Sequence, residues 1–238
     1  MTYQKMSEHT DKTGYVLHGR RKGRPLRTNK TALMQSLLPR IKINLETKLH
    51  LAELFPSSKE VWLEVGFGGG EHLVWQAIEN PNIGMIGCEP YVNAVASMLD
   101  HIDKNAVQNI RIHSDDARML MDALPDASIS KCFVLFPDPW PKNRHASRRF
   151  IGPDNLPKLA RIMKPGAQLR VASDDPTLQD WMLEHMRASA DFIPAPDTEH
   201  GMRRTRLPDW PATRYEIKEL AKKRPNWKGP EYYVFIRK

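Results

Sequence analysis

The chain alternates short apolar runs with longer amphipathic segments over most of its length, and this alternation constrains its fold more than any other feature. Nearly unbroken apolar runs are typical of parallel strands covered on both faces, whereas apolar residues spaced three and four apart predict helices. Repeated strand–helix units predict an α/β fold, a doubly wound and mostly parallel sheet with right-handed crossovers. The predicted strands span residues 61–65, 83–88, 110–113, 129–136 and 168–172, and the predicted helices span 71–78, 92–102, 118–124, 155–163 and 177–189.

The two ends of the chain depart from this central pattern. Residues 1–31 are polar, basic and rich in Gly, without apolar periodicity, so we expect a flexible arm or one that orders on a partner. Apolar residues at helical spacing predict a helix over 41–54, and residues 232–236 predict a final strand, antiparallel and at or near an edge. Because 238 residues suit one sizeable α/β domain, we expect 32–238 to form a single domain.

The charge of the chain indicates an anionic partner. Its 36 Lys+Arg exceed its 28 Asp+Glu, which gives a net charge of +8. Nine Lys or Arg and no acid stand between Lys12 and Leu45, and further basic clusters occur at 142–149, 203–206 and 218–228. Basic residues gathered into clusters favour a nucleic acid as the partner.

Other features bear on where the protein works. The sequence has no apolar stretch long enough to span a membrane and no apolar h-region near its N-terminus, so we expect neither a membrane span nor a secretory signal. Cys88 and Cys132 lie inside apolar runs, which predicts buried thiols and a reducing cytoplasm. The nine His show no metal-ligand spacing such as H-E-x-x-H, so we expect no metal site.

The first predicted strand ends in a glycine-rich turn that follows an acid, Glu64. The turn carries Gly66, Gly68 and Gly70, where a bare backbone can approach a ligand closely. A dinucleotide-binding loop would have its third glycine at position 71, but Glu71 stands there. A carboxylate beside this loop would repel a pyrophosphate, whereas it suits the cationic sulfonium and ammonium groups of S-adenosylmethionine.

Acids also follow the second and third predicted strands. Glu89 comes about 20 residues after the glycine loop, where a carboxylate can accept both ribose hydroxyls of a nucleoside cofactor. Asp116 follows the third strand, where a carboxylate can take the adenine amino group. The carboxyl ends of parallel strands meet at one edge of a sheet, so Glu64, Glu89 and Asp116 together predict an S-adenosylmethionine site.

The fourth predicted strand is followed by FPDPWPKNRHASRR over residues 136–149. Three prolines around Asp138 and Trp140 make a stiff loop at the edge where ligands of such sheets bind. Trp140 can stack on a base and the Lys and Arg after it can bind phosphates, a combination typical of nucleic-acid recognition.

Four stretches resemble the bacterial tRNA (guanine-N(7)-)-methyltransferase family: LEVGFGGGEHL (63–73), IGCEPY (86–91), LFPDPWPKNRHASRR (135–149) and TRYE (213–216). The resemblance implies a methyltransferase that moves a methyl group from S-adenosylmethionine to N(7) of a guanine in tRNA, at the variable loop. We expect a monomer or weak homodimer that requires no protein partner. Two segments depart from the family: Ser173-Asp174-Asp175 replaces T-D-W, and the C-terminal GPEYYVFIRK lacks the frequent GH-x-V-x-D-L ending.

The resemblance also implies roles for particular residues, with Asp138 as the catalytic one. Together with the glycines of the turn, the expected cofactor-binding set is Glu64, Gly66, Gly68, Gly70, Glu89, Asp116 and Asp138. The expected substrate-binding set is Lys142, Asp174, Thr213, Arg214, Tyr215 and Glu216. The expected RNA contacts are Arg144, His145, Arg148 and Arg149.

The expected chemistry fits these residues, although other readings stay open. N(7) of guanine has a free lone pair and no proton, so its methylation needs alignment rather than a strong base. A carboxylate such as Asp138 can stabilise the positive charge that develops on the purine. The alternatives are a methyltransferase acting on an exocyclic amine, since Asp138-Pro139-Trp140 partly matches D/N-P-P-aromatic, and a non-catalytic RNA-binding subunit with a degenerate cofactor fold. Glu71 argues against a third, a nicotinamide-dependent oxidoreductase.

Overall fold

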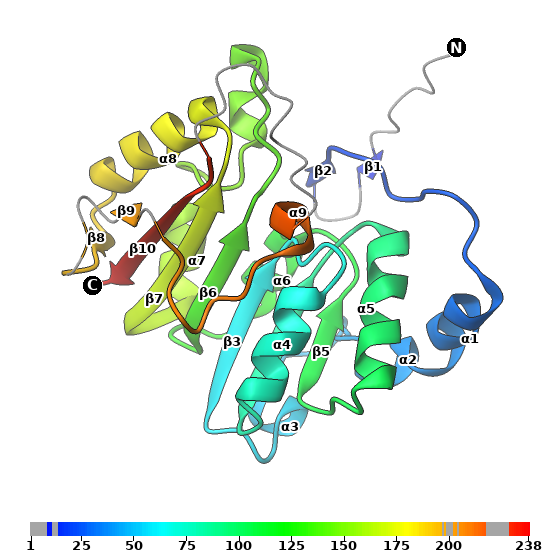
Figure 1. Cartoon of the computed structure of the whole chain (residues 1–238). Coiled ribbons are helices and arrows are strands. Elements are labelled where there is room, and N and C mark those ends of the chain that lie inside the picture. Colours follow the sequence, from blue (N-terminus) through cyan, green and yellow to red (C-terminus); the bar gives the residue numbers. More distant parts are fainter. Residues whose placement is uncertain (1–8, 11–13, 197, 199–201, 204, 218–228) are drawn as a thin grey trace, which may run out of the picture.

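The computed structural model describes residues 9–10, 14–196, 198, 202–203, 205–217 and 229–238. Within them, an eight-stranded sheet has the order β5-β4-β3-β6-β7-β10-β8, with β9 also paired to β10 (Figure 1). The first five strands in this order are parallel, and the order reverses between β3 and β6. Their bounds are β3 Glu60–Val65, β4 Ile83–Cys88, β5 Ile110–His113, β6 Ile129–Leu135 and β7 Met163–Ser173.

Helices cover both faces of the sheet, so its strands are apolar on both sides. Leu73 of α4 and Leu99 of α5 are fully buried in one core, and Leu120 of α6 and Leu159 of α7 in the other. The chain thus forms a doubly wound α/β fold, as predicted. The helices of the first face are α4 Glu71–Glu79 and α5 Val92–Lys104, and those of the second are α6 Ala117–Ala123, α7 Leu156–Ile162 and α8 Pro176–Ala188.

The C-terminal strand is antiparallel, as predicted. β10 Glu231–Arg237 pairs with β7 in this sense. On its other side it pairs with β8 Phe192–Pro194 and β9 Met202–Arg203, two short strands that we did not predict. β10 is therefore next to the edge rather than the edge itself.

The predicted helix over 41–54 is wrong. Its place is taken by two single-turn helices, α2 Leu38–Ile41 and α3 Leu51–Leu54, with irregular chain between them. There the Ile43 amide donates to the Ile112 carbonyl of β5 at 2.8 Å, and the Ile43 side chain is 2% exposed. Ile43 and Leu49 are buried from chain that is not helical, because tertiary contacts override local periodicity.

The N-terminal segment lies across the carboxyl end of the sheet. β1 His9–Thr10 and β2 Val16–Leu17 pair in the antiparallel sense. Residues 14–27 then run to α1 Thr28–Ser36, which packs on α5 (Figure 1). Arg21 pairs with Asp115 through two hydrogen bonds of 2.9 Å, and the Arg21 carbonyl accepts from the Val92 amide. The expected boundary at residue 31 thus falls inside a helix, and the division into arm and domain stays a prediction.

Two further expectations concern buried thiols and membrane segments. Cys88 and Cys132 are free and 1% and 0% exposed, which confirms them as core residues. Among the residues that the structure describes, no helix is both long and apolar enough to cross a bilayer.

Candidate active site

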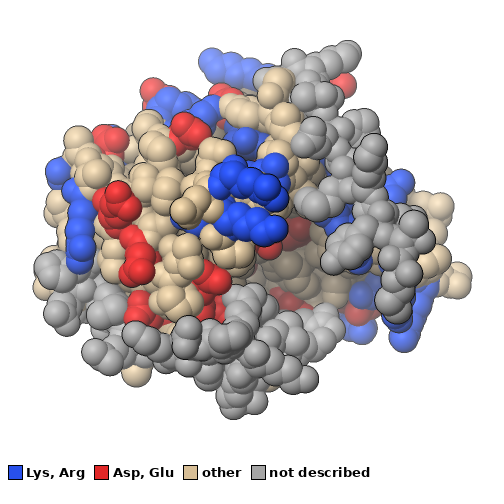
Figure 2. Space-filling model, turned by 90° about the horizontal axis from the view of Figure 1, so that it is seen from above, with Lys and Arg blue, Asp and Glu red and all other residues tan. Residues whose placement is uncertain are grey.

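A cavity of about 820 Å³ opens at the carboxyl ends of β3, β4, β5 and β6. This is the edge of the sheet beside the point where the strand order reverses, the place where ligands of doubly wound folds bind. Viewed along the strands toward this edge, the surface has a hollow with acidic side chains inside and basic side chains beside it (Figure 2). A cavity with an acidic interior and a basic rim therefore lies at the edge of the sheet to which the strand order points.

The glycine turn after β3 forms one wall of this cavity. Gly66, Gly68 and Gly70 have φ of 73°, 54° and 87°, in the left-handed region that side chains rarely adopt. At Gly70, which begins α4, a Cβ atom would also lie 2.1 Å from the sulfur of Met98. The glycines at 66 and 68 face open space, which leaves the backbone bare toward a ligand.

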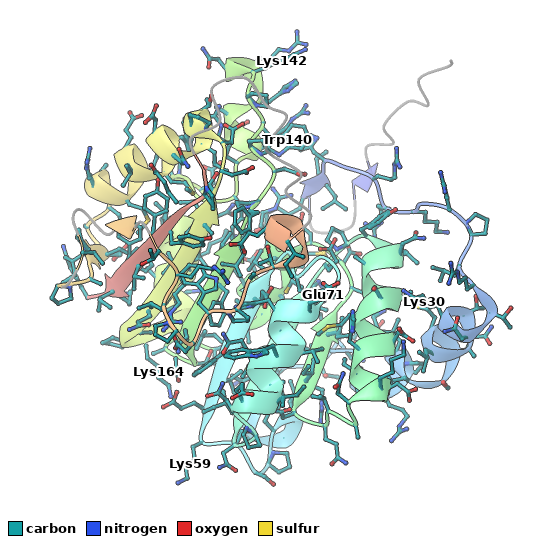
Figure 3. All side chains as sticks on the ribbon, viewed as in Figure 1. Lys30, Lys59, Glu71, Trp140, Lys142 and Lys164 are labelled. Atoms are coloured by element: carbon teal, nitrogen blue, oxygen red, sulfur yellow. The ribbon has the colours of Figure 1, made fainter. Side chains whose placement is uncertain are left out.

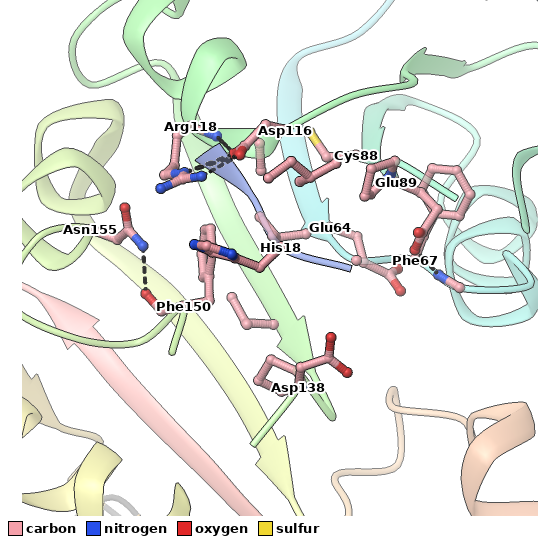
Figure 4. A pocket seen from close by; sticks show the side chains of 18 of the residues that line it. His18, Glu64, Phe67, Cys88, Glu89, Asp116, Arg118, Asp138, Phe150 and Asn155 are labelled. Atoms are coloured by element: carbon pink, nitrogen blue, oxygen red, sulfur yellow. Dashed lines mark hydrogen bonds and ion pairs between the residues drawn. The ribbon is translucent and has the colours of Figure 1, made fainter. Parts of the chain in front are cut away.

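Three carboxylates converge on the cavity from three neighbouring strand ends: Glu64 in β3, Glu89 after β4 and Asp138 after β6 (Figure 4). Both oxygens of Glu89 are fixed, since Gly68 and Tyr91 donate their amides to them at 3.0 Å. Burial raises the pKa of Glu89, as do the charges of Asp138 and Glu64, although the amide bonds act the other way. Loss of solvation also raises the pKa of Asp138. A cationic ligand would relieve this repulsion.

Asp116 and Asp115, after β5, are engaged by arginines. The Asp116 side chain caps α6 by accepting from the Arg118 amide at 2.9 Å, and its second oxygen pairs with the Arg118 guanidinium (Figure 4). Burial raises the pKa of Asp115, but the hydrogen bonds and charge of Arg21 outweigh it and hold that pKa below its usual value. Asp116 lines the cavity as predicted, but its carboxylate also has a structural task.

The loop after β6 is held in a strained conformation. Phe136 and Trp140, on either side of Asp138, have φ of 52° and 42°, which is unusual for side chains of this size. Arg149 braces the loop by donating to the carbonyls of Pro139 and Trp140 at 3.1 Å. The surrounding structure thus fixes the main chain on both sides of Asp138, as expected of a site that must be preorganised.

This bracing corrects one expectation. We placed Arg149 among the RNA contacts, but its side chain is 5% exposed and its guanidinium lies 4.7 Å from the ring of Trp181. Buried under the loop, it is not available to a phosphate. The other basic residues of the stretch differ: Lys142 and Arg144 are exposed and Arg148 is half-buried. Arg149 was grouped with them because the sequence shows a run of charge, not which side chains turn inward.

Trp140 is the centre of an aromatic and basic cluster at the rim. Its ring meets His18 at 6.0 Å and His145 at 5.8 Å, both edge to face, and the guanidinium of Arg148 lies 5.0 Å from it. Trp140 and Lys142 project beyond the carboxyl ends of the strands (Figure 3). Slight desolvation and the charges of Arg148, Arg144 and Lys142 lower the pKa of His145. The cluster offers an aromatic face and positive charge beside an acidic cavity.

The expected substrate-binding residues do not all lie at the cavity. Thr213 lines the cavity, and it forms a capping box with Glu216 at the start of α9 Arg214–Ile217: the Thr213 amide donates to Glu216 at 2.7 Å, and the Glu216 amide donates to the Thr213 hydroxyl at 3.3 Å. Glu216 also accepts from the hydroxyl of Tyr232. The T-x-x-E spacing thus has a structural role of its own.

The remaining substrate residues lie farther out or outside the described part. Asp174 is 6% exposed at the end of β7, and Lys142 is exposed on the loop; neither is among the described residues that line the cavity. The side chains of Arg214 and Tyr215, like the basic cluster at 218–228, fall outside the described residues.

Sequence reasoning missed part of the cavity wall. Residues 14–18 of the N-terminal segment line it, and Arg118 binds this segment by donating to the Val16 carbonyl at 2.9 Å; Asn155 also lines the cavity. The segment shows no apolar periodicity, so only the Lys and Arg around it, without an acid between Lys12 and Leu45, could have pointed to an acidic neighbour. No group of three or more His, Cys, Asp or Glu within the described ranges could hold a metal ion.

Known proteins with similar sequences are methyltransferases. A family model described as "Putative methyltransferase" matches residues 58–229. The chain is 47% identical to a tRNA (guanine-N(7)-)-methyltransferase of Paramagnetospirillum magneticum, over 92% of each chain. It is 41% identical to one of Agrobacterium fabrum, over 100% of each chain.

Solved structures agree in fold. The 16S rRNA methyltransferase KamB matches with a TM-score of 0.55 at 18% identity, over 79% of this chain and 93% of that one. A rRNA methylase from Streptococcus thermophilus matches with a TM-score of 0.52 at 11% identity, over 82% and 99%. These likenesses place the sheet among methyltransferase folds, and the sequence identities are decisive for the family. The chain belongs to the tRNA (guanine-N(7)-)-methyltransferase family.

Proposed function

We propose that the protein transfers a methyl group from S-adenosylmethionine to N(7) of a guanine in tRNA. The observation that carries this proposal is the convergence of Glu64, Glu89 and Asp138 on a glycine-lined cavity whose rim holds Trp140 amid basic side chains. Membership of the family supports the tRNA substrate and the guanine target. We further propose that the target is the variable-loop guanine.

The residues of the cavity fit S-adenosylmethionine. That cofactor supplies an electrophilic methyl group on a cationic sulfonium. The two carboxylates whose pKa is raised, Glu89 and Asp138, are the kind of unneutralised anions that a cationic ligand stabilises. Glu89 has both oxygens fixed by amides and is oriented before any ligand arrives. We assign cofactor binding to Glu64, Gly66, Gly68, Gly70, Glu89, Asp116 and Asp138.

The acceptor chemistry needs little from the protein beyond alignment and charge. N(7) of guanine already has a lone pair, so the enzyme removes no proton before attack. Positive charge appears on the purine as the methyl group moves, and a fixed carboxylate stabilises it. We assign this role to Asp138; support comes from the strained residues on either side of it and from Arg149 below, which hold its loop in one conformation.

The tRNA would bind above the cavity, on the rim. Lys142, Arg144 and Arg148 supply positive charge there, and Trp140 and His145 supply aromatic faces. We assign substrate contacts to Lys142, Asp174, Thr213, Arg214, Tyr215 and Glu216. The protein would act as a monomer or weak homodimer in the cytoplasm, where its free thiols remain reduced.

Nucleoside mass spectrometry of tRNA after reaction tests the proposal directly, because it identifies both the base and the ring position. We expect 7-methylguanosine. Methylation of an exocyclic amine would favour the amine-directed enzyme instead, and tRNA binding without methyl transfer would favour a non-catalytic subunit.

A tRNA carrying 7-deazaguanine at the modified position sharpens this test. The analogue keeps the Watson–Crick edge and the stacking face but replaces the nucleophilic nitrogen with C–H. We expect near-normal binding and no methyl transfer. Methylation of the analogue would show that another atom is the acceptor.

A further inference from the structure

A line of buried polar side chains runs from the cavity, through α4, to the segment that leads to Thr213. Glu64 in the cavity wall lies 2.7 Å from Nδ1 of His72, and Nε2 of His72 lies 3.3 Å from Nε2 of Gln76. Gln76 then donates to the carbonyl of Asp209 at 2.8 Å. The side chains of Glu64, His72 and Gln76 are 2%, 3% and 1% exposed. Water therefore does not compete for these bonds.

The bonding partners fix every proton in this line. A carbonyl only accepts, so the group of Gln76 that faces Asp209 is its amide nitrogen, which has two N–H donors and no acceptor. The second N–H points to Nε2 of His72, which must accept and is therefore unprotonated. Nδ1 of His72 then holds the proton and donates it to the Glu64 carboxylate. A single neutral tautomer of His72 satisfies all three bonds.

The far end of the line is anchored to the sheet. Arg170 of β7, 3% exposed, binds the Asp209 carboxylate through two bonds of 2.9 Å. Burial raises the pKa of Asp209, but the bonds and charge of Arg170 outweigh this and lower it, so the carboxylate stays ionised. The next residue, Trp210, is 1% exposed and packs edge to face on Tyr232. Thr213 follows three residues later and lines the cavity.

We propose that His72, Gln76, Asp209 and Arg170 are positioning residues that couple Glu64 in the cavity wall to the segment 209–216, whose Thr213 lines the same cavity. This rests on the proposed function for the identity of the two ligands. A bound cofactor restricts the motion of the Glu64 side chain. Through the line of hydrogen bonds, this also restricts the main chain before Thr213. His72 and Gln76 lie one turn apart on α4, so their side chains are neighbours. One helix thus connects Glu64 to the segment before Thr213.

Hydrogen–deuterium exchange of the full chain with and without S-adenosylhomocysteine tests this coupling without requiring tRNA. We expect the product to slow exchange of the amides in 205–213 about fivefold or more, within the usual range of coupling between sites. Gln76→Met removes both N–H donors at similar volume. It should abolish the slowing while cofactor affinity, measured by calorimetry, stays within about threefold of the parent.

A second variant keeps the test decisive if Gln76→Met does not fold. His72→Phe preserves the edge-to-face contact with Phe133, whose ring lies 4.9 Å away, but removes both hydrogen bonds. It should abolish the slowing and also weaken cofactor binding about tenfold, because Glu64 loses its donor. Glu79→Ala is the matched control: Glu79 is exposed on α4 and lies outside the line, so its loss should leave the slowing intact.

Two results would overturn the coupling: no slowing in the parent protein that binds S-adenosylhomocysteine, or equal slowing in Gln76→Met. Failure of the proposed function would be seen separately. If the parent does not bind S-adenosylhomocysteine, both proposals fall. If it binds the product and shows the slowing but methylates an atom other than guanine N(7), the coupling stands and only the function is revised.

Discussion

The two sides of the cavity are built in opposite ways. On the β3–β4 side, Glu64 is buried and bonded to His72, and Glu89 has both oxygens fixed by backbone amides. On the β6 side, Trp140 and its basic neighbours stand at an open rim, and Arg149 holds the main chain beneath them. A small cofactor of constant shape suits the first arrangement. A large polyanion suits the second, since phosphates bind to exposed charge that can adapt.

Removing Glu89 should produce the largest effect, confined to the cofactor side. We expect Glu89→Ala to weaken binding of S-adenosylmethionine by about one to three orders of magnitude, because charge-assisted hydrogen bonds are each worth about 1.5–3 kcal/mol. The variant also frees the Gly68 amide, which loosens the glycine turn. Calorimetry on the folded variant measures the loss.

Asp100→Ala is the matched control, since Asp100 pairs with Lys104 on the outer part of α5 and lines no part of the cavity within the described residues. It should bind the cofactor normally. If Glu89→Ala also binds normally, or loses tRNA affinity to the same degree as cofactor affinity, the two sides of the cavity are not separate.

Asp138→Ala should act on rate, because Asp138 belongs to the side that meets the acceptor. Loss of one preorganised electrostatic partner costs roughly a hundredfold in turnover. Folding should change little, since the side chain is exposed to the cavity rather than packed in the core. Single-turnover methyl transfer to tRNA at saturating cofactor measures the chemical step. A rate within about threefold of the parent would remove Asp138 from catalysis.

Much of the cofactor side could be predicted from the sequence, and less of the acceptor side. The position of Glu64, Glu89 and Asp116 along the cavity could be predicted because strands and turns are local patterns, and parallel strands place their carboxyl ends together. Arg149 was misplaced because its burial depends on Trp181, a residue far along the chain. The N-terminal wall and the line from Glu64 to Asp209 were missed for the same reason: their partners, such as Arg21 with Asp115, are distant in sequence.

The smallest expected effect separates two arginines within one loop. Arg144 is exposed, so Arg144→Ala should remove one phosphate contact and flatten the slope of log affinity against log salt by about 0.7–0.9. The free energy of unfolding of this variant should not change.

Arg149 is buried and braces Pro139 and Trp140, so Arg149→Ala should leave two carbonyls without donors and destabilise the fold by about 1–3 kcal/mol. Its salt slope should match that of the parent. Titrations of tRNA at several salt concentrations, with denaturant unfolding of each variant, measure both quantities. If Arg149→Ala instead flattens the slope and keeps its stability, the guanidinium reaches RNA in solution and the loop is not held from beneath.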